Sequence, residues 1–89
     1  MAKSMELRVV SPEKTVFEGR ARSVVVPAWD GRVGVLPGHA PLITLLGAGP
    51  LRVDAEEGGA QAFEISGGVL KVEGDSVTVL ASKVGASGS

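Results

Sequence analysis

The chain has 89 residues, a formal net charge of −1 and no cysteine. This length suits one domain, and the lack of cysteine excludes a disulfide framework and thiol chemistry. The nine basic and ten acidic residues are spread along the chain, so no basic cluster indicates a nucleic-acid site. No apolar run approaches the ~18 residues of a membrane-spanning helix, and the first residues lack the apolar centre of a signal peptide.

The first third of the chain predicts three short strands. Apolar residues alternate with charged ones over residues 5–9, which is typical of a strand buried on one face. After a turn, a second strand is expected over residues 15–18 and a third over residues 21–26. Gly19 and Pro27 are expected to end these two strands, because glycine weakens a strand and proline cannot donate to the ladder.

The stretch Trp29–Leu46 contains the only Trp and the only His of the chain. Asp30-Gly31 favours a tight turn, because glycine tolerates positive φ. A short strand over residues 33–36 and a stiff loop with prolines on both sides of His39 follow. The apolar run over residues 42–46 predicts a buried strand, since it is short for a helix. This combination indicates a rigid loop on a β scaffold and favours a binding role.

Glycine-rich breaks divide the rest of the chain. Residues 47–50 and 67–68 are expected to interrupt strands, and residues 56–59 to form a hairpin tip. Only 3% of the residues are aromatic, so the core is expected to be aliphatic and rich in valine. We therefore expect an all-β fold, a two-sheet antiparallel β-sandwich of about nine to ten short strands. It would span residues 1–84, with a disordered tail at residues 85–89.

Residues suited to catalysis are scarce. His39 is the only imidazole, no G-x-S-x-G elbow occurs, and one His without Cys does not make a zinc site. The glycines near residue 34 lack the Lys and Ser/Thr of a phosphate-binding loop. We expect His39 to be a loop histidine bonded to backbone. Trp29 is expected either to fold over its own hairpin or to lie in an interface. The chain is thus predicted to have no catalytic residue, cofactor or metal.

Three segments carry a resemblance to a known family. They are VVSPEKTVFEG at residues 9–19, VVVPAWDGRVGVLPGHAPLITLLGAGPLRV at residues 24–53, and FEISGGVLKVEGDSVTVLA at residues 63–81. With them the chain resembles the epsilon subunit of F-type ATP synthase almost continuously from Leu7 to Ala81. The most specific parts are Gly31–Leu42 and Ser66–Gly68, whose order and spacing also fit.

This resemblance implies a non-catalytic β-sandwich at the foot of the central stalk. One face would bind the gamma subunit and the lower end would bind the polar loops of the membrane c-ring. The subunit would turn with the rotor and support coupling of proton (or sodium) flow to ATP synthesis. It would lie at the cytoplasmic face of the bacterial inner membrane, held there only through the complex, with no nucleic-acid partner. The implied gamma contacts are His39, Ala40, Pro41, Leu42 and Thr44, and the implied c-ring contacts are Asp30, Gly31 and Arg32.

Two features depart from the family pattern. Most bacterial members continue past the sandwich as a helical hairpin, which in some of them restrains ATP hydrolysis or binds ATP. The sequence here stops just after the sandwich, as a naturally short subunit or a part of a longer one would, so no inhibitory arm is expected in it. Arg32 stands where many bacterial relatives carry an acid, and Asp30 is the acid that could replace it.

Two other classes of function compete with this interpretation. One is a free-standing small β-sandwich binding module with an unknown ligand. The other is a small hydrolase that uses His39, which the lack of catalytic partners disfavours. Co-purification with the other subunits of the synthase separates the first alternative from a rotor subunit. Hydrolase activity that survives the substitution His39→Ala would exclude the second alternative, a hydrolase that uses His39.

Overall fold

The computed structural model describes residues 4–86, and these residues form strands, turns and loops without a helix. The strands are β1 (Met5–Val10), β2 (Thr15–Ala28), β3 (Gly31–Val35), β4 (Leu42–Ala55), β5 (Gly59–Glu73) and β6 (Ser76–Ala86). The predicted all-β class is confirmed, but the described residues form six strands rather than nine or ten. They contain no helical segment with the length and apolar character needed to cross a membrane.

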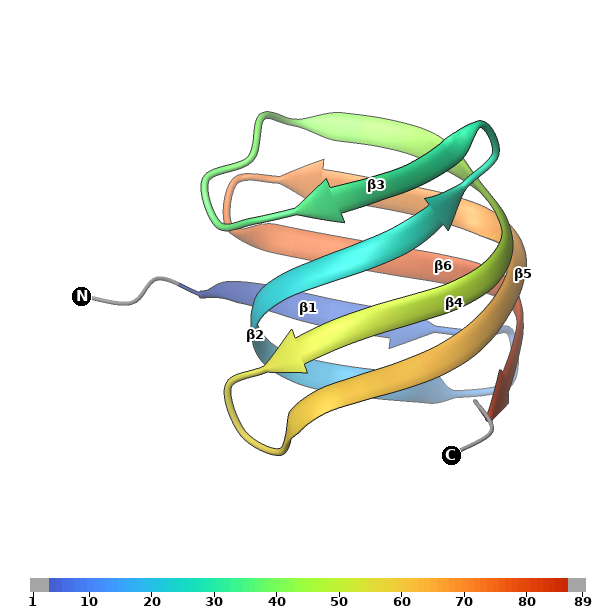
Figure 1. Ribbon diagram of the computed structural model, residues 1–89, viewed down its shortest axis with the longest axis horizontal. Coiled ribbons are helices and arrows are strands. Elements are labelled where there is room, and N and C mark those ends of the chain that lie inside the picture. Colours follow the sequence, from blue (N-terminus) through green and yellow to red (C-terminus); the bar gives the residue numbers. More distant parts are fainter. Residues whose placement is uncertain (1–3, 87–89) are drawn as a thin grey trace.

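The strands form a single sheet that closes on itself (Figure 1). Its order is β1-β6-β5-β4-β2-β3, and a further pairing of β1 with β2 joins the ring. β1 runs parallel to β6, whereas the other pairings are antiparallel. The expectation of a wholly antiparallel arrangement is therefore wrong at this one pairing. Parallel neighbours need a long connection, and the four strands between β1 and β6 supply it.

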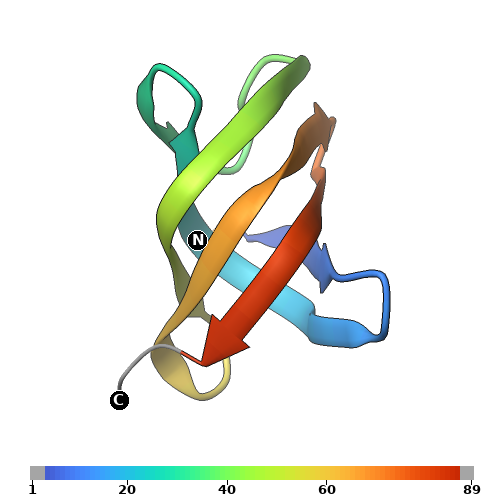
Figure 2. The same ribbon diagram turned by 90° about the vertical axis from the view of Figure 1, so that its right-hand side faces the viewer.

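The strand count is lower than expected because three strands continue through the predicted breaks. β2 runs through Gly19 and Pro27, β4 through Gly47–Pro50, and β5 through Gly67-Gly68. β4 and β5 curve round the right-hand side of Figure 1, and Figure 2 shows them side by side with β6 from that direction. Glycine in these strands produces a bend rather than an end. The bend lets one long strand continue from one side of the closed sheet to the other.

Gly68 is the tightest point of this bend. Its φ is +132°, and a Cβ built on it would lie 2.1 Å from the backbone oxygen of Leu80 on β6. The ladder between β4 and β5 also skips a residue on each strand here, because the pair Leu46–Gly68 is followed by Ala48–Ser66. Only glycine allows the two backbones to approach so closely.

The core fills the inside of the closed sheet and is aliphatic, as predicted. Eighteen apolar side chains of the described residues are buried, and eight of them are valines. Phe17 and Phe63 are only partly buried and pack at its margin. The predicted hairpin tip is confirmed at residues 56–58, which connect β4 to β5, whereas Gly59 is already the first residue of β5. At the other end, Gly85 and Ala86 belong to β6 rather than to the expected tail, and residues 87–89 lie outside the described residues.

Candidate functional site

The turn between β2 and β3 exposes the residues that the resemblance assigns to a c-ring. Ala28 pairs with Gly31, so Trp29 and Asp30 form a two-residue turn, one position earlier than the Asp30-Gly31 dipeptide suggests. Asp30, Gly31 and Arg32 are all exposed. The ion pairs among residues 4–86 join other side chains, so both charges of the turn are available to a partner.

The loop between β3 and β4 is held by its own backbone. The N–H of His39 donates to the oxygen of Leu36 at 3.1 Å. This bond closes a turn around Pro37 and Gly38, whose φ of +84° favours glycine. The ring Nδ1 of His39 lies 2.7 Å from the backbone oxygen of Ala40. The prediction of a loop histidine bonded to backbone is therefore confirmed.

The two predicted contact groups do not form one site. The turn and the loop lie at opposite ends of β3 (Figure 1), and this strand has five residues. At ~3.3 Å per residue, about 16 Å of extended chain separates them. This spacing suits contacts with two partners or with two parts of one large partner.

The start of β4 presents side chains that sequence reasoning missed. Leu42 and Thr44 are half-buried, and Leu42 packs against the core. The residues that follow each of them, Ile43 and Leu45, point outward and are 71% and 61% exposed. The run over residues 42–46 is thus a strand with one face outside, not a fully buried one. The sequence does contain a sign of this exposed face: Ile43 and Leu45 occupy positions where a half-buried strand normally carries polar residues.

These two side chains belong to a larger exposed surface, here called the apolar face. Leu80 on β6 pairs with Val10 on β1 and with Val69 on β5, and Val69 pairs with Leu45 on β4. A row of apolar side chains therefore crosses four strands, with Ile43 beside it. Leu80 is 49% exposed. Val10 and Val69 are half-buried and the other three side chains are exposed, and a contiguous apolar surface of this kind suits contact with a partner. The apolar face consists of Val10, Ile43, Leu45, Val69 and Leu80.

Trp29 lies at the β4 end of this row. Its backbone N–H donates to the oxygen of Leu45 at 3.1 Å. The residue is 69% exposed, which is inconsistent with a ring folded over its own hairpin. Of the two roles expected for Trp29, the structure thus favours an interface.

A second outer surface, here called the small-residue face, covers the other halves of β4 and β5 together with β2. Its cross-strand rows contain short side chains and two charged ones, and it has a shallow hollow of about 270 Å³. The carboxylate of Asp54 lies 3.6 Å from the guanidinium of Arg22, in a half-exposed pair. This face consists of Ser23, Val25, Arg52, Asp54, Ala60 and Ala62.

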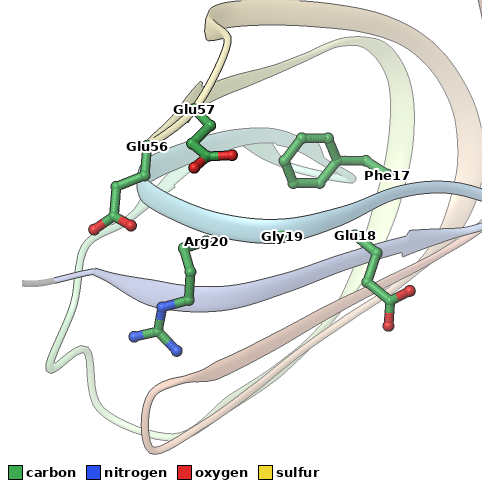
Figure 3. Close-up of a pocket in the computed structure, with 6 residues that line it drawn as sticks. All are labelled: Phe17, Glu18, Gly19, Arg20, Glu56 and Glu57. Carbon is green, nitrogen blue, oxygen red and sulfur yellow. The ribbon is translucent and has the colours of Figure 1, made fainter.

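Another hollow lies between β2 and the hairpin tip and holds about 360 Å³ (Figure 3). Its charged side chains do not converge. Arg20 donates to the hydroxyl and backbone oxygens of Ser4, and Glu18 pairs with Arg8 at 3.4 Å. Glu56 is held by its backbone N–H, which donates to the oxygen of Arg20 at 2.9 Å. This arrangement offers no positioned acid, base or nucleophile for catalysis.

The geometry therefore defines a class of protein: a small closed β domain whose exposed features suit docking. Within the described part of the chain, no three His, Asp or Glu side chains gather to hold a metal ion. The exposed features are the apolar face, a charged turn at one end of β3 and a braced loop at the other. The charged turn carries Asp30 and Arg32, and the braced loop is the β3–β4 connection over residues 36–41. Each suits contact with a macromolecule rather than with a small substrate.

Comparison with known proteins places the chain in a family. Residues 4–86 match the family described as the ATP synthase delta/epsilon chain, β-sandwich domain. The chain belongs to this family, as the resemblance predicted. The ATP synthase epsilon chain of Acinetobacter baylyi is 44% identical over 78 residues, which cover 88% of this chain and 56% of that protein. The chain thus spans little more than half the length of this curated relative.

Solved structures agree with the fold. The mitochondrial ATP synthase of Euglena gracilis, described as OSCP, F1 and c-ring in one rotational state, contains a chain that matches with a TM-score of 0.84 at 23% identity. The match covers 92% of this chain and 52% of that one. A chain in the central stalk and c-ring of the Tetrahymena thermophila mitochondrial ATP synthase matches with a TM-score of 0.78 at 15% identity, covering 94% and 67%.

Proposed function

We propose that this chain works as a non-catalytic central-stalk subunit of an F-type ATP synthase, of the epsilon type. It joins the gamma subunit to the c-ring and thereby supports coupling of ion flow to ATP synthesis. Family membership and the identity to an epsilon chain support this role. The subunit would be peripheral to the membrane through the complex, at the cytoplasmic face of the inner membrane in a bacterium.

The apolar face is the observation that carries the proposal. Ile43, Leu45 and Leu80 are large aliphatic side chains on one outer surface, each about half exposed or more. Leaving them in water costs roughly 25 cal/mol per Å² of apolar area, and a docked partner removes this cost. A stalk subunit needs such a permanent contact, whereas a domain that binds a small ligand needs a concave site.

We assign the apolar face and the braced loop to gamma. In this proposal His39, Ala40 and Pro41 contact gamma directly, because His39 is partly exposed and the other two are exposed. Leu42 and Thr44 support the contact from beneath, since they lie on the inward side of β4. We further propose that the bent strands divide the closed sheet into the two packed layers of a β-sandwich. The apolar face would then lie on the outside of one layer and the small-residue face on the outside of the other.

We assign the charged turn to the polar loops of the c-ring. Asp30 lies in the β2–β3 turn and Arg32 is the second residue of β3; the two side chains carry opposite charges and are exposed. Charges in such a position steer and register a partner more than they hold it. The turn and the gamma-facing loop at the two ends of β3 would then link ring and stalk through one short strand.

Binding to gamma tests the proposal. The double variant Leu45→Ser, Leu80→Ser should lose most of its affinity for a gamma-containing F1 complex prepared without its own epsilon subunit. Arg52→Ser, on the small-residue face, is the matched control and should bind as the unmodified chain does. Thermal melting should be nearly unchanged in all three proteins, because the altered side chains are exposed.

Two results would contradict the proposal. Equal binding by the double variant and the control would remove the apolar face from the interface. Failure of the unmodified chain to bind F1, or to co-purify with any subunit of the synthase, would favour the free-standing binding module instead.

A further inference from the structure

Trp29 is an unusual residue for its position. Tight two-residue turns favour Gly, Asn and Asp, because these residues adopt the required backbone angles. The turn at residues 29–30 instead places the largest apolar side chain of the chain at a tip, 69% exposed. Neither turn geometry nor core packing explains an indole there. An exposed Trp in a fixed position is characteristic of an interface.

The backbone around Trp29 is fixed against the apolar face. The N–H of Trp29 bonds to the oxygen of Leu45, and Ala28 pairs with Leu46. Gly47 lies so close that a Cβ built on it would be 3.2 Å from the oxygen of Ala28. The base of the turn is thus pressed against β4, so little backbone entropy remains to be lost when a partner covers the indole.

We propose that Trp29 is part of the docking surface formed by the apolar face, and that the partner covering this face buries the indole. The inference rests on the proposed function, in which that partner is gamma. The row of apolar side chains that crosses β1, β6, β5 and β4 then continues onto the β2–β3 turn. Trp29 is its last member, and the charged residue Asp30 follows. Trp29 is the residue at which the apolar contact changes to the charged contact.

The chemistry of the neighbours favours gamma over the c-ring as the occupant. Leu45, to whose backbone Trp29 is bonded, is 61% exposed and apolar, so a partner surface that covers Leu45 must also be apolar. Polar ring loops would gain little from covering an indole and much from meeting Asp30 and Arg32. Continuity with the apolar face therefore assigns the Trp29 side chain to gamma, although its turn also carries the charges assigned to the ring.

A single fluorine label tests the assignment. The chain has one Trp, so incorporation of 5-fluorotryptophan gives one ¹⁹F resonance. The difference in its chemical shift between H₂O and D₂O reports exposure to solvent. This difference should be large in the free chain, nearly vanish when the unlabelled gamma-containing F1 complex binds, and persist when detergent-solubilised c-ring alone is added. Persistence with bound F1, or loss with the c-ring alone, would overturn the inference.

Affinity provides the second measurement. Trp29→Ala should weaken binding to F1 at least about tenfold, as loss of a Trp side chain that a partner buries does. Trp29→Phe should recover most of the affinity, and Arg52→Ala should bind normally. The melting temperature should not change, because the indole is exposed and the backbone bond remains. Normal binding by Trp29→Ala would overturn the inference while leaving the proposed function intact.

Two further outcomes separate the remaining explanations. If the labelled Trp29 becomes shielded when the free chain is concentrated without F1, a second copy covers it and the inference is wrong. If the unmodified chain does not bind F1 at all, the proposed function fails, and the assignment of Trp29 to its gamma contact fails with it.

Discussion

The apolar face and the small-residue face are built from the same two long strands, yet they differ sharply in composition. β4 and β5 contribute Ile43, Leu45 and Val69 to the first face. Beyond the bend they contribute Arg52, Asp54 and alanines to the second. Both faces cover the same aliphatic core, so the need for a core cannot explain why large aliphatic side chains are exposed on only one of them.

The difference teaches where a partner is needed. On the small-residue face, Asp54 pairs with Arg22, and none of the large exposed hydrophobic side chains of the described residues lies there. Such a surface is stable in solvent without a partner. On the apolar face, side chains at alternate outward positions of β4 are Ile and Leu, where solvent favours polar residues. The exposure of large aliphatic side chains on only one half of the closed sheet therefore supports the proposal that this half is the docked one.

The largest expected effect comes from breaking the bend that separates the two faces. Gly68→Ala would place a Cβ 2.1 Å from the backbone oxygen of Leu80, at a φ of +132°. β5 or β6 must then move, and the apolar face loses its alignment. We expect a loss of about 3 kcal/mol or more in the free energy of unfolding, measured by urea denaturation.

Gly34→Ala is the matched control for this prediction. Gly34 lies on β3, has open space where a Cβ would stand, and has no positive φ. Its change should stay within about 0.5 kcal/mol. Similar stability of the Gly68 and Gly34 variants would mean that the close approach of β5 and β6 is not a constraint on the fold.

The sequence predicted the strand content and the core better than the continuity of the strands. Alternation along β1 and the excess of valine correctly indicated an all-β fold with an aliphatic core. The glycines at positions 47, 67 and 68 were interpreted as ends, because local turn chemistry is the same for a break and for a bend. Only the pairing of β4 with β5 across this region, which is non-local, distinguishes the two.

The turn and the loop at the two ends of β3 could be predicted from the sequence, but the outward side chains of β4 could not, and the contacts assigned to these residues stay predictions. The loop at His39 and the turn at Asp30 were found from glycine, proline and their spacing. The outward residues Ile43 and Leu45 were missed, because a continuous apolar run does not reveal which side chains face inward. That choice depends on register, and a shift of one residue exchanges the two faces of a strand.

Neighbouring positions on β4 sharpen the comparison. Leu42→Ala should lower the free energy of unfolding by about 1–2 kcal/mol, because Leu42 packs against the core. The affinity of the Leu42→Ala variant for F1, measured per folded molecule, should change little. Ile43→Ala should do the opposite, with stability within about 0.5 kcal/mol of the unmodified chain and affinity lower by about 1–2 kcal/mol. Calorimetry and titration with F1 measure the two quantities.

The opposite pattern would exchange the roles of the two residues. If Leu42→Ala weakened binding without loss of stability, the contact set expected from the sequence would be the better description of the interface. If Ile43→Ala lowered the free energy of unfolding, the Ile43 side chain would contribute to packing within the domain rather than to the contact with a partner.

The charged turn should give a smaller effect that depends on salt. Reversal of both charges, Asp30→Arg with Arg32→Asp, should weaken association with the c-ring by about 0.2–1 kcal/mol per charge pair, since exposed pairs contribute little. The weakening should fall as salt rises above 0.1 M, where the screening length is about 10 Å. Binding to F1 without the ring should be unchanged. An unaltered ring association at low salt would remove Asp30 and Arg32 from this contact.

The smallest expected effect concerns the hydrolysis of ATP, where neither face should act. Residues 4–86 form a compact body of 34 × 26 × 22 Å, and their exposed surfaces suit docking rather than reaching toward a distant catalytic site. Addition of this 89-residue chain to F1 that lacks epsilon should therefore leave the rate of ATP hydrolysis unchanged. In the membrane-bound enzyme the same addition should raise proton-coupled synthesis, because it joins stalk and ring. Strong suppression of hydrolysis by this chain would show that one of the two faces, or the loop at His39, restrains rotation directly. The Leu45→Ser, Leu80→Ser variant would then identify the surface, since it should release the suppression only if the apolar face is responsible.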